Sequence, residues 1–305
     1  MFLVTQFIGL WVVNAYSPIS HEIIDPSTGE KTILLEENPL PFGLQTPSEE
    51  PSQNFISVVF SFALAFAIIF ILMKYKWRFV IRSWFFLVIA LAIAISLNAF
   101  LKNYVLSTSI VAIVIALPLA FWKIFKPNVY AHNFTELLIY PGIAAVFVPI
   151  LTPLSIIGLL ILISIYDMWA VWKSGIMQKM AKFQMEELRL FGGFLIPSAS
   201  DKVKNQIKRL REKYKDKKIP KKIKNKKFKV NLAILGGGDV IFPIITAGVF
   251  MRAYNLTSAL FIIFGALAGL VFLFSITKKG KAYPAMPYIT TGIFLGMLLW
   301  KILIF

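Results

Sequence analysis

The run LLIYPGIAAVFVPILTPLSIIGLLILISIYDMWAVW, from Leu137 to Trp172, decides the fold class, because its 36 residues hold a single charge, Asp167. About 20 apolar residues are enough to cross the hydrocarbon layer of a membrane. As one helix, at roughly 1.5 Å per residue, the run would measure about 54 Å, which is too long for one crossing. We therefore expect two consecutive membrane helices, with Pro149 and Pro153 marking the turn between them.

The rest of the chain has the same apolar character. Of its 305 residues, 58% are hydrophobic and only 15% are charged, which is more apolar side chain than one soluble core could hide. The composition and the charge-poor runs predict an all-α, polytopic transmembrane bundle of about nine helices. The other expected spans are Phe2 to Tyr16, Phe55 to Met73, Ser83 to Phe100, Tyr104 to Trp122, Val230 to Met251, Leu256 to Ile276 and Tyr283 to Trp300. The first is short, but it lacks the positive segment with which a cleaved signal peptide begins.

The basic residues are concentrated in one segment. The stretch from Lys173 to Lys229 holds 19 of the 32 Lys and Arg and five acids, so it accounts for most of the net charge of +17. Such a block beside apolar spans is typical of a cytoplasmic loop that faces anionic lipid, and it argues against a nucleic-acid partner. We expect the N-terminus in the cytoplasm and the C-terminus outside. The predicted regions are 1–172, with helices one to six and an acidic outside loop at 17–54 that could form a short hairpin, the basic loop 173–229, and 230–305 with the last three helices.

Two aspartates stand inside apolar sequence. Of the 15 acidic residues, only Asp167 and Asp239 lie within expected spans, while Glu136 lies at the cytoplasmic entrance of the fifth. A carboxylate at membrane depth costs about 2.5 kcal/mol or more, so each is a functional candidate. Asp167 would lie about 9 Å and Asp239 about 15 Å from the cytoplasmic end of its helix. A close approach of the two therefore requires helix tilt or a later start of the seventh span.

The sequence around Asp239 favours the close approach of another helix. Gly236, Gly237 and Gly238 precede it and remove side chains from the helix surface, while Pro243 cannot donate to the carbonyl group of Asp239. Two adjacent carboxyl groups in a site of low dielectric constant share one proton. The ionised group can then activate water for attack on a peptide carbonyl, and the protonated group can donate to the carbonyl oxygen.

Other chemistries lack their residues in this sequence. There is no cysteine, and the two histidines, His21 and His132, lie in polar connections, so thiolate chemistry, a His metal site and a Ser-His triad are not expected. The two-aspartate mechanism needs no metal or cofactor. Its substrate, a transmembrane segment, must unwind locally. A strand at Phe228 to Leu232 could pair with the unwound backbone.

The ordered motifs resemble those of the presenilin and signal peptide peptidase family of intramembrane aspartyl proteases. Tyr166-Asp167 matches the YD motif of the family, Gly236-Gly237-Gly238-Asp239 its GxGD motif, and Pro284-Ala285-Met286 its PAL motif, in which Met replaces Leu. The resemblance covers essentially the whole chain and looks closest to archaeal members. It implies Asp167 and Asp239 as catalytic residues, and substrate-binding or supporting roles for Tyr166, the three glycines and Pro284-Ala285-Met286. Transmembrane proteins or peptides would be the substrates.

Two alternatives remain open on the sequence. A prepilin or preflagellin peptidase also carries a GxGD aspartate, but it resembles a smaller bundle and does not account for Pro284-Ala285-Met286. A proton-coupled transporter could use the two aspartates as a relay, because intramembrane acids also mark such pathways. It predicts an inverted repeat, which the sequence does not display. The sequence does not name the substrates, the oligomeric state, any partner subunit, or whether the loop 173–229 is itself cut.

Overall fold

The computed structural model is a bundle of α-helices, and it describes residues 1–24, 31–36, 38–44, 51–75, 77–102, 104, 107–126, 128–174, 192–198, 231–277 and 283–304. Nine α-helices lie within these ranges, one at each expected span. Six of them have the length and composition of membrane spans, which confirms the polytopic fold class; the full count of nine crossings stays a prediction. The helices are α1 (Phe2–Ala15), α2 (Pro51–Lys74), α3 (Arg78–Leu101), α4 (Thr108–Phe125), α5 (Val129–Phe147), α6 (Pro153–Trp169), α10 (Gly237–Ala253), α11 (Leu256–Ile276) and α12 (Met286–Ile304).

The long apolar run divides where the prolines predict. Helix α5 ends at Phe147, a 3₁₀ turn covers Val148–Ile150, and α6 begins at Pro153. The hydroxyl of Thr152 caps α6 by accepting a hydrogen bond from the backbone N–H of Ser155 at 3.2 Å. Proline is favourable at the first helical position because its missing N–H would have no partner there. The predicted pair of helices is therefore confirmed.

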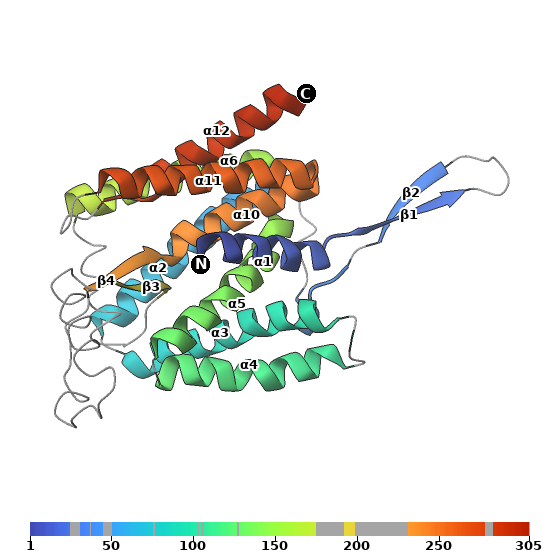
Figure 1. Cartoon of the computed structure of the whole chain (residues 1–305). Coiled ribbons are helices and arrows are strands. Elements are labelled where there is room, and N and C mark those ends of the chain that lie inside the picture. The colour runs from blue at the N-terminus through green and yellow to red at the C-terminus, as the bar shows by residue number, and fades with distance from the viewer. Residues whose placement is uncertain are drawn as a thin grey trace, which may run out of the picture.

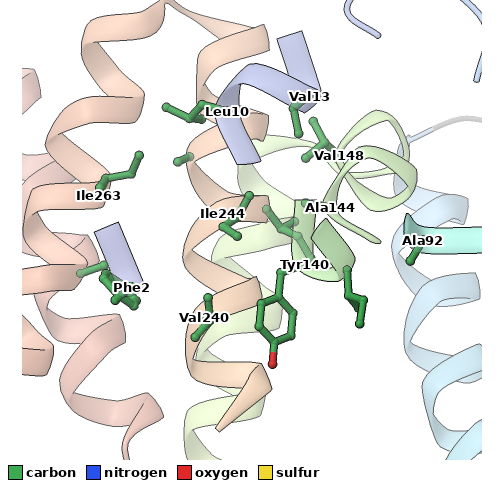
Figure 2. Close-up of a cluster of buried hydrophobic side chains, with 14 of the residues drawn as sticks. Phe2, Leu10, Val13, Ala92, Tyr140, Ala144, Val148, Val240, Ile244 and Ile263 are labelled. Carbon is green, nitrogen blue, oxygen red and sulfur yellow. The ribbon is translucent and has the colours of Figure 1, made fainter. Parts of the chain in front are cut away.

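Helix α10 lies at the centre of the bundle. It packs against α1, α5, α6, α11 and α12, while α3 and α4 pair with each other and both pack against α5 (Figure 1). Figure 2 shows the core at this crossing, where Val13 of α1 lies beside Val148, and Ile244 of α10 lies beside Ala144 of α5. Many outward side chains are large and apolar, such as Phe79 with 83% of its surface exposed, as expected for contact with lipid.

Glycines bring pairs of helices into backbone contact. A Cβ atom at Gly142 of α5 would lie 1.9 Å from the carbonyl oxygen of Ala92 in α3. The same holds between α11 and α12, where a Cβ atom at Gly265 would lie 2.3 Å from the carbonyl oxygen of Gly292. Without a hydrophobic driving force in lipid, such close packing is a main source of helix association.

Two antiparallel hairpins complete the described structure. Strands β1 (Ile19–Ile24) and β2 (Lys31–Glu36) form the hairpin that the outside loop predicts, and it extends away from the helices (Figure 1). Strands β3 (Gly193–Ser198) and β4 (Asn231–Gly236) pair with Gly193 opposite Gly236. The expected all-α class thus holds for the bundle, and these four short strands add to it.

The second hairpin corrects the predicted start of the seventh span. Residues 231–236 form β4, and α10 begins only at Gly237, seven residues after the expected start at Val230. The predicted strand at Phe228 to Leu232 overlaps β4 at its last two residues, and the other three lie outside the described residues. The charged run from Asp201 to Asp216, expected to be helical, also lies outside them.

The start of the fifth span was placed too late. Helix α5 begins at Val129, eight residues before the expected Leu137, and Asn128 caps it by accepting a hydrogen bond from the N–H of Tyr130. His132 is therefore a buried helical residue and was wrongly placed in a polar connection. The helix can include the charge of Glu136 because Lys123 of α4 pairs with that carboxylate at 2.5 Å.

Candidate active site

The two intramembrane aspartates lie near one end of the bundle. Asp167 is third from the end of α6, which continues as a π-type turn over Ala170–Ser174, and Asp239 is the third residue of α10. The helices α6 and α10 pack against each other. The side chain of Asp167 is buried and that of Asp239 is partly buried.

The late start of α10 places Asp239 nearer the end of its helix than the sequence predicts. With β4 occupying residues 231–236, Asp239 stands about 4.5 Å along its helix rather than 15 Å, at roughly 1.5 Å per residue. Asp167 is equally close to the end of α6. Both aspartates therefore stand within one turn of a helix end, Asp167 before the end of α6 and Asp239 after the start of α10.

The residues Pro284, Ala285 and Met286 lie directly against Asp167. The backbone N–H of Met286 donates a hydrogen bond to Oδ2 of Asp167 at 3.0 Å. The N–H of Ala285 is a second backbone donor to this carboxylate. Met286 is the first residue of α12, so this N–H has no partner within the helix. The start of a helix favours a negative charge, so the motif presents a polarised end to Asp167.

A second contact holds α6 against α12 one turn further along. The hydroxyl of Ser164, three residues before Asp167, donates to the hydroxyl of Thr290 at 2.9 Å. Thr290 is four residues after Met286, so the two contacts lie on one face of each helix. Both hydroxyl groups are buried. Together the contacts fix the orientation of Asp167 relative to the start of α12.

The three glycines before Asp239 have different surroundings. A Cβ atom at Gly236 would lie 2.9 Å from Oδ2 of Asp239, and one at Gly237 would lie 3.0 Å from the hydroxyl oxygen of Tyr140. At Gly238 it would meet only the ring of Phe242, at 3.6 Å. Close approach therefore needs glycine at the first two positions. The space at Gly236 is the space that the carboxylate of Asp239 uses.

The structure does not bring every expected residue to the aspartates. The side chain of Tyr166 is 41% exposed, and its ring lies 6.3 Å from the ring of Trp169, on the outside of α6. Among the described residues, no group of three or more His, Asp or Glu side chains is placed to hold a metal ion.

Sequence reasoning missed one polar residue that contacts the helix of Asp239. Gln6 in α1 is fully buried, and its amide nitrogen donates to the carbonyl oxygen of Val240 at 3.0 Å. A glutamine within an apolar span was the available signal, because a polar side chain at that depth needs a partner. Gln6 therefore ties α1 to the first turn of α10.

The fold and the site together define a class of protein: a helical membrane protein with two carboxyl groups, those of Asp167 and Asp239, on helices that pack against each other. A family model described as signal-peptide peptidase, presenilin aspartyl protease matches residues 32–304. The chain therefore belongs to this family of aspartyl proteases, and it is a multi-pass membrane protein.

Solved structures agree with the family assignment at the level of the fold. The chain is similar to a presenilin family intramembrane aspartate protease solved in two space groups, C222 and P2. The TM-scores are 0.61 and 0.60, both at 17% sequence identity. The alignments cover 99% of this chain and 96% and 95% of the solved chains. Among curated proteins, no sequence matches this chain.

Proposed function

We propose that this protein is an intramembrane endopeptidase of the GxGD type, which hydrolyses peptide bonds within transmembrane segments by means of Asp167 and Asp239. The observation that carries the proposal is that these two aspartates stand within one turn of the ends of two helices that pack against each other, with the start of α12 donating to Asp167. The ionised carboxylate takes a proton from water, the water attacks the scissile carbonyl carbon, and the protonated carboxyl group donates to the carbonyl oxygen. This addition gives a gem-diol intermediate. Its C–N bond then breaks as the leaving nitrogen accepts a proton.

The residues around the two aspartates support a mechanism in which one carboxyl group is ionised and the other is protonated. The N–H groups of Ala285 and Met286 stabilise a negative charge on Asp167, while Gly236 leaves the space that the carboxylate of Asp239 occupies. Pro284 cannot donate a hydrogen bond, so the start of α12 stays irregular where a substrate would approach. Tyr166 is retained as a candidate for substrate contact from the exposed side of α6.

We infer that the substrates are transmembrane proteins or peptides that enter from the bilayer, with the N-terminus of the enzyme in the cytoplasm and its C-terminus outside. The basic segment 173–229 supports this orientation, and both aspartates lie at the end of the bundle next to that segment. An unwound substrate could add to the edge of the β3–β4 hairpin, whose last residue, Gly236, begins the motif.

A reconstituted enzyme tests the proposed reaction. Purified protein in liposomes is given a reporter transmembrane peptide, and the products are identified by mass spectrometry across a range of pH. We expect cleavage within the membrane-embedded part of the peptide, with a rate that rises and then falls with pH, because one carboxyl group must be ionised and the other protonated. Cuts confined to the flanking polar residues would contradict the proposal. Proton flux across the same liposomes without any cleavage would instead support the transporter.

A further inference from the structure

A buried polar stripe on α5 links the cytoplasmic end of the bundle to the turn that carries Asp239. His132, Glu136 and Tyr140 follow one another at intervals of four residues, so they lie along one face of the helix. All three side chains are buried. We call these three residues the α5 polar stripe. The proposed catalytic steps use none of them.

The first part of the stripe contacts the backbone of β3. Nε2 of His132 lies 2.7 Å from the carbonyl oxygen of Gly193, and Nδ1 lies 3.3 Å from Nζ of Lys123. The ammonium group of Lys123 can only donate, so Nδ1 accepts and Nε2 carries the hydrogen that is donated to Gly193. Glu136 pairs with Lys123 at 2.5 Å, and its carboxylate lies 3.5 Å from the N–H of Gly193.

A neighbouring side chain holds the next part of the strand. The amide of Asn133 donates from Nδ2 to the carbonyl oxygen of Leu195 at 2.8 Å and accepts from the N–H of Leu195 at 2.9 Å. A neighbouring strand would bond the N–H and the carbonyl oxygen of Leu195 in the same way, so the side chain of Asn133 replaces a strand partner at this residue of β3. The β3–β4 pairing then transmits this position, because Gly193 stands opposite Gly236.

The last member of the stripe reaches the motif itself. The hydroxyl oxygen of Tyr140 would lie 3.0 Å from a Cβ atom at Gly237, two residues before Asp239. The buried hydroxyl has no well-formed hydrogen bond to the described residues. Figure 2 shows the ring of Tyr140 on the face of α5 that meets α10, level with Val240.

We propose that the α5 polar stripe, together with Asn133 and Lys123, is a positioning unit that fixes β3 and, through β4, the turn that carries Asp239. The inference rests on the proposed function, since it assigns these residues to the same reaction. Bundle stability alone does not require them, because a buried ion pair can be replaced by apolar side chains at little cost or with a gain. Their contacts with the hairpin are instead what apolar side chains could not supply.

A conservative rescue at His132 tests the contact with β3. His132→Gln keeps an N–H donor near the place of Nε2, whereas His132→Leu removes it. In liposomes we expect His132→Leu to lower kcat by about tenfold or more with little change in KM, because small errors in the placement of catalytic groups are costly. His132→Gln should recover most of that loss. Equal activity of the two variants would overturn the proposal.

A double substitution separates positioning from stability. Glu136→Leu leaves the buried ammonium group of Lys123 without its partner, so the thermal midpoint should fall. Adding Lys123→Met removes that charge, and we expect the midpoint to return to within a few degrees of the wild type. The kcat value should stay reduced by about tenfold, because the N–H of Gly193 still lacks its acceptor and β3 has lost one of its contacts with α5. Recovery of kcat in step with the midpoint would show a merely structural role and overturn the proposal.

Reference variants in the same assay distinguish the two ways of failing. If Asp167→Ala or Asp239→Ala still cleaves the reporter, the proposed function itself fails. If both are inactive while His132→Leu and the double variant keep the kcat of the wild type, only the positioning inference fails. A rise in KM with unchanged kcat would assign the stripe to substrate binding and would also overturn it.

Discussion

Adding one methyl group at Gly236 should displace the carboxylate of Asp239 without changing the backbone. Gly236 has φ −59° and ψ 146°, which alanine adopts without strain, so Gly236→Ala changes only the space beside the main chain. The new Cβ atom would lie 2.9 Å from Oδ2 of Asp239. An unstrained contact needs roughly 3.5 Å, so the carboxylate must move by about 0.6 Å.

The size of the effect follows from this displacement. A misplacement of about 1 Å can lower a rate about 100-fold, so we expect kcat for Gly236→Ala to fall between about tenfold and 100-fold. Gly236 is also the residue before the first turn of α10, where alanine is a poorer cap, and this should cost at most about 1 kcal/mol of stability. The folded fraction should therefore stay high, and the loss should appear in kcat rather than in yield.

The assay is cleavage of a reporter transmembrane peptide in liposomes, with the thermal midpoint measured in parallel. Gly192→Ala is the matched control, because a Cβ atom there has no neighbour within 4 Å, and it should cleave as the wild type does. Wild-type kcat for Gly236→Ala, in a preparation where Asp239→Ala is inactive, would refute the reasoning. It would mean that the carboxylate acts from a position other than the one beside Gly236.

Three further predictions concern the packing of the bundle. Gly142→Ala places a methyl group 1.9 Å from a carbonyl oxygen of α3, and thermal unfolding in detergent should show a loss of about 1–3 kcal/mol or more. Gly292→Ala should cost a similar amount by separating α12 from α11, where the distance is 2.2 Å, and an unchanged midpoint would contradict the packing. Tyr16→Phe removes the hydroxyl that donates to the buried carbonyl oxygen of Ile95 at 2.8 Å, so stability measured by chemical unfolding should fall by about 1–2 kcal/mol.

Much of the fold could be predicted because the membrane restricts it to helices of known length. The excess of apolar residues indicated a bundle of membrane helices, and the length of the run from Leu137 to Trp172 with the prolines at its turn was sufficient to divide that run into two helices. The boundaries failed where polar side chains are satisfied inside the protein. Glu136 was read as the polar entrance of a span, but its partner Lys123 on another helix allows α5 to begin earlier.

In the candidate site, too, the sequence predicts the residues that stand out locally but not the features that depend on remote contacts. Asp167 and Asp239 stand out in the sequence, because an unpaired carboxylate in an apolar span is costly. The place of Asp239 near the start of α10 could not be derived, since it depends on β4 and on a strand partner, Gly193, that is distant in sequence. The contacts of His132 and Gln6 were missed for a related reason. Each side chain contacts a backbone group of a segment that is distant in sequence, and the local sequence contains no pattern that predicts such a contact.

The most direct test of the central claim compares three proteins in one liposome assay: the wild type, Asp167→Ala and Asp239→Ala, each with and without an aspartyl transition-state analogue. Because the proposed mechanism uses both carboxyl groups in each turnover, we expect cleavage by the wild type, its inhibition by the analogue, and no cleavage by either variant. All three proteins should fold to the same thermal midpoint within a few degrees. Continued cleavage by either folded variant would contradict the two-aspartate mechanism.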